Sequence, residues 1–279
     1  MTTCTSISGG MTSAYLAANY PTDLNVFALV RIEDEACRYP DEVLRRRVED
    51  RIQKPFIATA EDDKIITTIF DLEQHLGREI QWVSGITYDE VVRSKGGMLP
   101  NKLHRYCTTW MKLSPIFEWW QSMNIEPITM HIGYRANETA RAARMKKKTN
   151  DAGVLSYKGV VGKHPNGKNK WATVAWQRPR FPLIEDKIIK TDIIKYWTGK
   201  NVTFAEYNNC VGCFHRNPAF LRFMWQEHPS KMEWFAKQEG GRKGTWKEQT
   251  SYYGIKKMLS QETLFSTDFT SCDAGYCGM

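Results

Sequence analysis

The sequence predicts an α/β fold: an open, mostly parallel sheet with helices on both faces, followed by a mainly helical, cysteine-bearing C-terminal region. Up to about residue 150, short apolar runs alternate with segments of helical spacing, which is typical of parallel βαβ units. A glycine pair, Gly9-Gly10, stands where the first such strand meets the first helix. Beyond residue 150 this alternation stops, and pairs of cysteines follow.

Each strand is predicted from a short stretch rich in apolar or β-branched residues, and each helix from apolar residues at helical spacing. Residues 25–32, for example, are mostly apolar and bounded by polar residues, as in a buried parallel strand. Apolar residues recur at helical spacing from Val43 to Ile52. The predicted strands cover residues 2–8, 25–32, 56–60, 79–84 and 127–133. The predicted helices cover residues 12–19, 41–53, 63–75, 114–123 and 138–147.

The second half of the chain has a different composition. Residues 153–170 are rich in Gly, Lys, His and Asn, which predicts a mobile loop. After Pro182 the pattern is mainly helical, with loops that carry the cysteines. We therefore expect an α/β domain over residues 1–150 and a C-terminal region over 151–279, with its CxxC pair and tail cysteines, packed on the first domain.

Composition sets limits on the class of protein. With 42% apolar and 12% aromatic residues among 279, the chain can bury a sizeable core and is not expected to be disordered. No apolar run approaches the ~20 residues that span a bilayer, so no membrane partner is expected. The N-terminus has no basic segment followed by a long apolar one. We expect a cytoplasmic protein with reduced thiols.

The formal net charge of +8 suits phosphate-bearing partners, either nucleotides or nucleic acid. Ordinary solvated lysines would give the same sum, so the charge alone does not choose between these interpretations.

The glycine pair lies in the stretch Ser8-Gly-Gly-Met-Thr-Ser13. Glycine has no Cβ, so the N–H groups of Gly9 and Gly10 can approach an anion closely. Ser8 and Ser13 add hydroxyl donors, and the following helix presents its positive N-terminal end. Such a loop suits a phosphate or pyrophosphate. The alternative is a glycine turn that joins two elements and binds nothing.

Basic residues follow the last predicted strand of the first half. Arg135 comes just after the strand end, while Arg141 and Arg144 share one face of the next helix. Guanidinium groups suit bidentate binding of phosphate or sulfate. The alternative is an exposed, charged helix, which we prefer for the adjoining lysines at 146–148.

The chain has seven cysteines, an odd number. Cys210-x-x-Cys213 is a compact chelate of the kind that binds zinc or an iron–sulfur cluster. Cys272 and Cys277 form a second pair near the end of the chain. His215 is a further candidate ligand, although a structural histidine is more common. Cys4 and Cys37 are expected to be buried, inert thiols.

Three further segments extend the pattern begun by the glycine loop. They are 105–115 (Arg-Tyr-Cys-Thr-Thr-Trp-Met-Lys-Leu-Ser-Pro), 133–144 (Gly-Tyr-Arg-Ala-Asn-Glu-Thr-Ala-Arg-Ala-Ala-Arg), and 182–186 followed by the CxxC pair. With these motifs in this order, the chain resembles the phosphoadenosine-phosphosulfate reductase-like family of PP-loop ATP pyrophosphatases. The resemblance runs from Ser8 to about Glu239.

The resemblance implies a Rossmann-like fold that binds an adenine nucleotide. It implies that the glycine loop surrounds phosphate and that Lys112 and Cys277 are catalytic. Thr12 stands where the family commonly has Asp, so a carboxylate that would orient Mg²⁺ is missing. The nucleotide-binding residues that it implies are Ser8, Gly9, Gly10, Ser13, Arg135 and Arg141. Glu33 and Asp34 correspond to the family's acidic segment near ribose or metal, or form a solvated acidic turn.

The resemblance also implies that Cys107 is a cluster ligand, and two metal sites then compete. In the first, Cys107, Cys210 and Cys213 hold a [4Fe-4S] cluster, with Cys272 or Cys277 as the fourth ligand. In the second, Cys210, Cys213, Cys272 and Cys277 form a closed Zn²⁺ site that holds the tail. A third role for Cys277 is that of a mobile nucleophile.

The leading interpretation is ATP pyrophosphatase or adenylating activity coupled to sulfur transfer, because the intact glycine pair favours ATP. The acceptor would be a nucleic acid or a sulfur carrier. One alternative is a reductase of phosphoadenylyl sulfate or adenylyl sulfate. The other is a non-catalytic module that binds nucleotide or nucleic acid.

Overall fold

The computed structural model describes residues 1–208, 210–240 and 244–258, which form two compact units. The sheet unit comprises residues 1–28, 64–83 and 114–204, and the cysteine unit comprises 29–63, 84–113 and the described residues from 205 onward. Each unit takes segments from both sides of residue 150, where the sequence suggested a domain boundary.

The sheet unit is built on a six-stranded sheet in the order β5-β2-β1-β6-β8-β7. All neighbouring pairs are parallel except β7 and β8, which confirms the predicted α/β class with a mostly parallel sheet. The central strands are buried, as their apolar sequences require. The strands are β1 (Thr3–Ile7), β2 (Leu24–Ala28), β5 (Gln81–Val83), β6 (Ile128–His131), β7 (Leu155–Lys163) and β8 (Asn169–Arg180).

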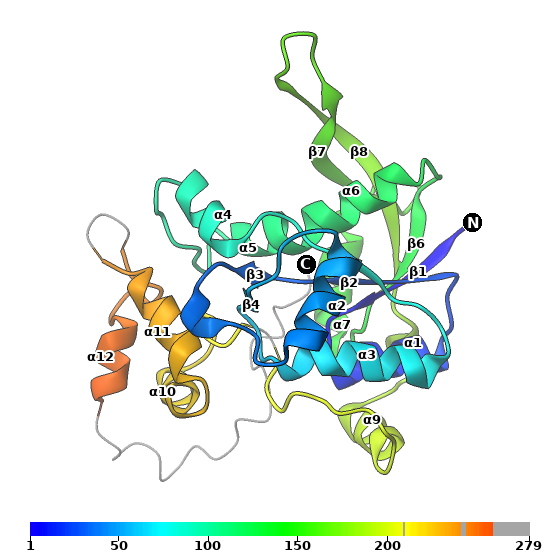
Figure 1. The fold of residues 1–279 in the computed structure, drawn as a ribbon. Coiled ribbons are helices and arrows are strands. Elements are labelled where there is room, and N and C mark those ends of the chain that lie inside the picture. Colours follow the sequence, from blue (N-terminus) through cyan, green and yellow to red (C-terminus); the bar gives the residue numbers. More distant parts are fainter. Residues whose placement is uncertain (209, 241–243, 259–279) are drawn as a thin grey trace. The chain divides into compact units, whose positions relative to one another are not determined.

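Helices cover both faces of this sheet. In Figure 1, α1 (Met11–Asn19) and α3 (Lys64–Leu76) run below the strands, and α6 (Ser114–Ser122) lies above them. Helix α3 has a well-separated apolar face of isoleucines, which is why it packs flat on its neighbours. The remaining helices of the unit are α7 (Thr139–Lys146), α8 (Pro182–Glu185) and α9 (Lys190–Trp197).

The prediction of a mobile loop over residues 153–170 is wrong, because β7 and β8 form a long hairpin there. Its five-residue end is closed by a bond from the His164 N–H to the Lys168 carbonyl at 2.8 Å. Its base packs on α6, where the Phe117 ring contacts Tyr157 and Trp176. One face of this hairpin is solvated, so apolar and polar residues should alternate along its strands. The many glycines and lysines obscure that alternation in the sequence.

The cysteine unit has little sheet. Strands β3 (Arg31–Ile32) and β4 (Ala58–Thr59) pair antiparallel. The apolar run 25–32 is therefore split, since β2 ends at Ala28 and β3 belongs to the other unit. The helices are α2 (Glu42–Ile52), α4 (Tyr88–Ser94), α5 (Tyr106–Thr108), α10 (Pro218–Glu227), α11 (Pro229–Lys237) and α12 (Tyr252–Lys257).

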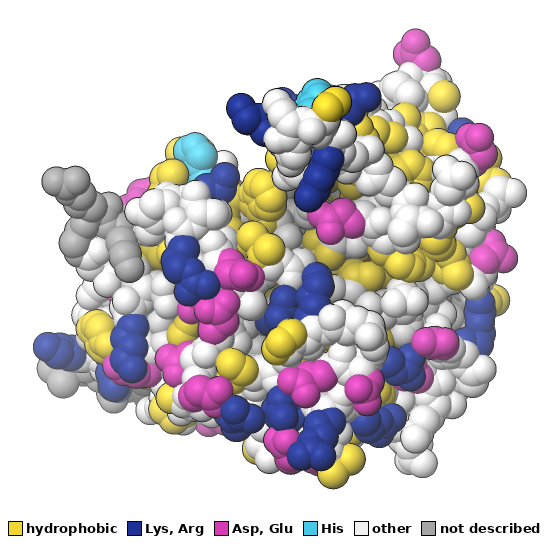
Figure 2. Space-filling model, turned by 45° about the horizontal axis from the view of Figure 1, so that its top comes forward, with side chains coloured by type: hydrophobic (Ala, Val, Ile, Leu, Met, Phe, Trp, Pro, Cys, Tyr) yellow, Lys and Arg dark blue, Asp and Glu magenta, His cyan; other side chains and the backbone are white. Residues whose placement is uncertain are grey.

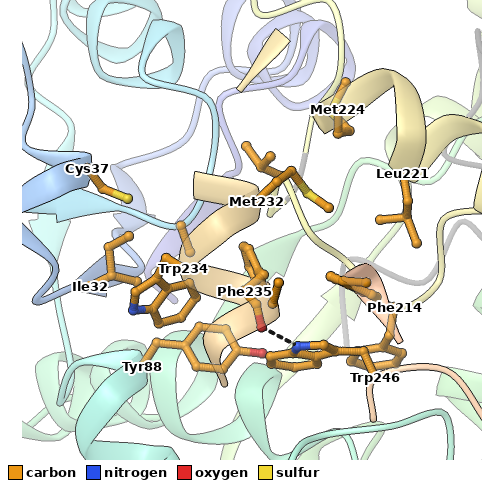
Figure 3. Close-up of a cluster of buried hydrophobic side chains, with 14 of the residues drawn as sticks. Ile32, Cys37, Tyr88, Phe214, Leu221, Met224, Met232, Trp234, Phe235 and Trp246 are labelled. Atoms are coloured by element: carbon orange, nitrogen blue, oxygen red, sulfur yellow. Dashed lines mark hydrogen bonds between the residues drawn. The ribbon is translucent and has the colours of Figure 1, made fainter. Parts of the chain in front are cut away.

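Aromatic side chains fill the core of the cysteine unit (Figure 3). The Trp246 indole N–H donates to the Phe235 carbonyl at 2.8 Å, and the Trp234 indole N–H donates to Asp89 at 3.0 Å. A Cβ on Gly212, inside the CxxC pair, would lie 2.4 Å from the Phe235 ring, so the CxxC turn packs directly on this core. Among the described residues, no helix is long and apolar enough to cross a membrane.

Candidate functional site

The turn between β1 and α1 is tightly built. Gly9 has φ +75°, and a Cβ there would lie 2.6 Å from the Ile65 side chain. Only glycine combines that backbone conformation with this contact. Gly10 is the N-cap of α1 with ordinary extended angles, and no side chain within the described chain caps this helix end. The first-turn N–H groups of α1 therefore have no intrahelical partner.

The hydroxyl groups of the two serines in the turn bond to each other. The Ser13 hydroxyl lies 3.1 Å from the Ser8 hydroxyl and accepts from the Ser8 N–H at 3.1 Å. It donates to the Gly10 carbonyl at 3.0 Å. Ser13 is buried, so its first role is to hold the turn in shape. Donors toward a ligand are then mainly the backbone N–H groups.

The order of the sheet gives this turn its importance. Strands β2 and β5 lie on one side of β1, whereas the next strand along the chain, β6, lies on the other side. The direction in which successive strands are added to the sheet therefore reverses between β1 and β6. Open α/β sheets bind ligands at the carboxyl edge where this reversal occurs. Gly133, just after β6, meets the turn there: a Cβ on it would lie 3.4 Å from the Thr12 side chain and 3.7 Å from the Ser13 Cα.

The two arginines predicted to bind phosphate share one carboxylate on the same side of the sheet. Glu138 accepts from Arg135 at 3.1 Å and from Arg141 at 2.6 Å. Burial raises the pKa of Glu138, but the Arg135 backbone N–H and the two guanidinium groups together hold it below its usual value. The Arg141 guanidinium also lies 4.2 Å from the centre of the Tyr134 ring. Glu138 thus orients both arginines, which sequence reasoning missed.

Other basic residues of this region are not gathered in the same way. Arg144 and the lysines at 146–148 are exposed on and after α7, as the alternative interpretation expected. Lys146 lies 5.7 Å from the centre of the Phe181 ring.

In the cysteine unit, Cys107, Cys210 and Cys213 line one cavity of about 50 Å³. Cys107 comes from α5, and the Cys213 N–H donates to the Cys210 carbonyl at 3.1 Å in the CxxC turn. Within the described residues, none of the three forms a disulfide. The fold therefore brings the three predicted ligands together. Cys272 and Cys277 lie outside the described residues.

The donor set of this cavity suits a thiolate-ligated cluster. Iron–sulfur clusters take cysteine thiolates, and a space of this size exceeds what one water needs. The thiols do not form a finished site, since no group of three or more His, Cys, Asp or Glu in the described part of the chain is spaced to hold a metal ion. Candidates for a fourth ligand are His215, which lines the same cavity, and the tail cysteines, which lie outside the described residues.

Positive charge surrounds the cavity, which is also lined by Arg105, Lys112 and His215. Burial raises the pKa of Cys107, while hydrogen bonds from Thr108 and the charges of Arg105 and Lys112 oppose that rise. Burial and nearby cations lower the pKa of His215 to about 4. His215 is therefore neutral at pH 7.

Lys112, predicted to be catalytic, forms an ion pair with Glu61 at 2.8 Å. The Glu61 side chain is 1% exposed, and its backbone pairs with Cys210 in an isolated bridge. Sequence reasoning missed Glu61. The signal was the acidic run 61–63 directly after a short strand, a place where a buried carboxylate needs a cationic partner.

The remaining candidates have structural roles. Glu33 pairs with Arg93 at 3.0 Å, and Asp34 accepts from the Ala36 N–H at 2.8 Å. Cys4 and Cys37 are buried, and burial raises the pKa of both thiols, to about 11 for Cys37. Their burial agrees with the expectation for these two thiols.

Comparison with known proteins adds no assignment. No family model matches the chain, and no curated protein or solved structure matches it significantly.

Proposed function

We propose that this chain is a Rossmann-like PP-loop enzyme that binds an adenine nucleotide and cleaves ATP between the α- and β-phosphates. One observation carries the proposal: the uncapped Gly9-Gly10 turn meets Gly133 where the strand order reverses. Bare backbone at a helix N-terminus at this edge suits an anionic ligand.

In the proposed reaction an acceptor oxygen attacks the α-phosphorus of ATP. A bond forms between them, the bond from the α-phosphorus to the bridging oxygen breaks, and pyrophosphate leaves with that oxygen. The N–H groups of the turn would hold the β- and γ-phosphates. Arg135 and Arg141, both oriented by Glu138, would add positive charge beside these phosphates. Sulfur transfer would then displace AMP from the activated acceptor.

The cysteine cavity supports the coupling to sulfur. Cys107, Cys210 and Cys213 would hold a [4Fe-4S] cluster together with Cys272 or Cys277. Such a cluster, when bound, supplies a site that exchanges electrons or holds a sulfur ligand. The shared cavity favours a ligand set that includes Cys107 over a closed Zn²⁺ site made of the CxxC pair and the two tail cysteines. Lys112, held by Glu61, would place a cation at the mouth of this cavity.

The same cavity favours one second candidate, a sulfonucleotide reductase. Its three thiols and its cations Arg105 and Lys112 suit a sulfur oxyanion and an electron donor. Cys277 would serve there as the nucleophile.

Product analysis separates the two candidates. Anaerobically purified protein is given ATP labelled at the α-phosphate in one assay, and adenylyl sulfate with a dithiol reductant in another. We expect labelled AMP and pyrophosphate from ATP, and we expect Lys112→Ala to form neither. Sulfite from adenylyl sulfate, with no AMP from ATP, would contradict the proposal and establish the reductase. Nucleotide binding with neither product would establish the non-catalytic alternative.

A further inference from the structure

The outer part of the β7–β8 hairpin is long and free of acidic residues. Between Asp151 and Glu185 the chain has lysines and arginines but no Asp or Glu. Strand β8 pairs with β6 only over Gln177–Arg180, so the hairpin runs beyond the sheet from its amino edge. Figure 1 shows it projecting from the sheet unit.

One face of the hairpin is packed and the other is solvated. A Cβ on Gly159 would lie 2.4 Å from the Phe117 ring, and Tyr157 packs on the same ring. Side chains alternate along a strand, so Lys158 and Val160 point to the opposite face. Lys158 is exposed there, across from an exposed Thr173.

The solvated face carries an aromatic ring between two lysines. Trp171 pairs with Val160, and Lys163 pairs with Asn169, two residues from Trp171. The strand register therefore places Lys158, Trp171 and Lys163 along the same face of the hairpin. Trp171 is 47% exposed. No other large apolar side chain of the hairpin is as exposed.

We propose that this face of the hairpin is a docking arm for single-stranded nucleic acid. Lysines that follow a phosphate backbone and an aromatic ring on which a base stacks are the two parts of such a surface. Figure 2 shows basic side chains at the hairpin's end, whereas acidic and basic side chains alternate lower on the same view. A single exposed ring favours base stacking over insertion into a lipid surface.

This inference rests in part on the proposed function, because it names nucleic acid as the class of acceptor. The arm leaves the amino edge of the sheet, whereas the glycine turn lies at the carboxyl edge. The arm would therefore recruit the acceptor and affect its KM rather than the chemical step.

The test is fluorescence anisotropy with a labelled, mixed-sequence single strand of about twelve nucleotides, without ATP. Lys158→Gln/Lys163→Gln should flatten the dependence of log K on log salt by about 1.4, from ~0.7 for each lost phosphate contact. Trp171→Ala should weaken binding roughly 5- to 100-fold, and Trp171→Phe should restore most of it. Lys195→Gln/Lys200→Gln, on and just after α9, is an equal loss of charge away from the hairpin and should change little.

Equal weakening by the α9 control would overturn the arm and leave only a net-charge effect. Unchanged binding in the hairpin variants, or a duplex bound as well as the single strand, would also overturn it. So would binding to phosphatidylserine vesicles or to poly-glutamate in place of the oligonucleotide. Since no nucleotide is added, failure here is distinct from failure of the ATP proposal.

Discussion

At the scale of single residues, Glu138 decides what the predicted arginines can do. It holds Arg135 and Arg141 by ion pairs of 3.1 and 2.6 Å and remains ionised because of them. Arg141 is also fixed over the Tyr134 ring. An anion bound nearby would meet guanidinium groups that are already oriented, so little side-chain entropy would be lost on binding.

Arg141→Ala is therefore expected to weaken ATP binding by about 1.5–3 kcal/mol, the contribution of a charge-assisted hydrogen bond. Arg141→Lys should recover little of it, because an ammonium group cannot form the bidentate fork. Calorimetric titration measures both. Arg144→Ala, an exposed arginine on the same helix, is the matched control and should bind ATP as the wild type does. Equal affinity in Arg141→Ala would rule out a binding role.

Cys107 offers a second test at this scale. We expect anaerobically purified wild type to be brown, and Cys107→Ser to lose colour and iron, because its thiol lines the cavity with the CxxC pair. Cys37→Ala, a buried thiol outside that cavity, should keep both. Absorption spectra and metal analysis of the three proteins measure the colour and the iron content. A colourless protein with one zinc, unchanged in Cys107→Ser, would support the closed Zn²⁺ site instead.

At the scale of elements, local signals predicted some segments well. Helix α2 was expected over 41–53 and spans Glu42–Ile52, because Asp41 caps it by accepting from two backbone N–H groups. The glycine turn was recognised from the Gly-Gly pair itself, although the close approach of Gly9 to Ile65 is a contact between distant parts of the sequence. The hairpin was missed because its strands are held by Phe117, which is distant in sequence.

Gly159→Ala tests that account of the hairpin. An added Cβ 2.4 Å from the Phe117 ring must displace the ring or the strand, which should cost about 1–3 kcal/mol of unfolding free energy. Urea denaturation gives the value. Phe117→Leu/Gly159→Ala should be less destabilised than the sum of the two single variants. Strict additivity would show that the ring and the glycine do not meet.

At the scale of the whole molecule, sequence patterns could not show how the chain divides. The run 25–32 contributes to both units, although Leu29 and Val30 are as buried as the residues before them. No local sequence signal marks the point where the chain leaves the sheet, because the residues before and after that point are both buried and therefore apolar. For the same reason the cysteine cavity was predicted only from the resemblance and the CxxC spacing, while Glu61 emerged from the fold.

Acid should weaken the fold of the sheet unit. Burial, then the charge of Arg180, lowers the pKa of His131 in β6 below its usual 6.5. The unfolded chain then binds a proton that the folded chain resists, so stability falls as pH drops through 6.5. The drop in urea midpoint between pH 7.5 and 5.5 should be smaller in His131→Asn than in the wild type. An identical drop would contradict this assignment.

The central claim is that the Gly9-Gly10 turn holds nucleotide phosphate, and calorimetric titration of ATP into Gly10→Val tests it most directly. Gly10 has extended backbone angles that valine can adopt, so the variant should fold while its side chain occupies the approach to the N–H groups. We predict micromolar ATP binding in the wild type and at least a ten-fold loss in Gly10→Val. Gly77→Asn, at a site with open space around the Cβ, should bind as the wild type does. Unchanged ATP affinity in a folded Gly10→Val protein would contradict the claim.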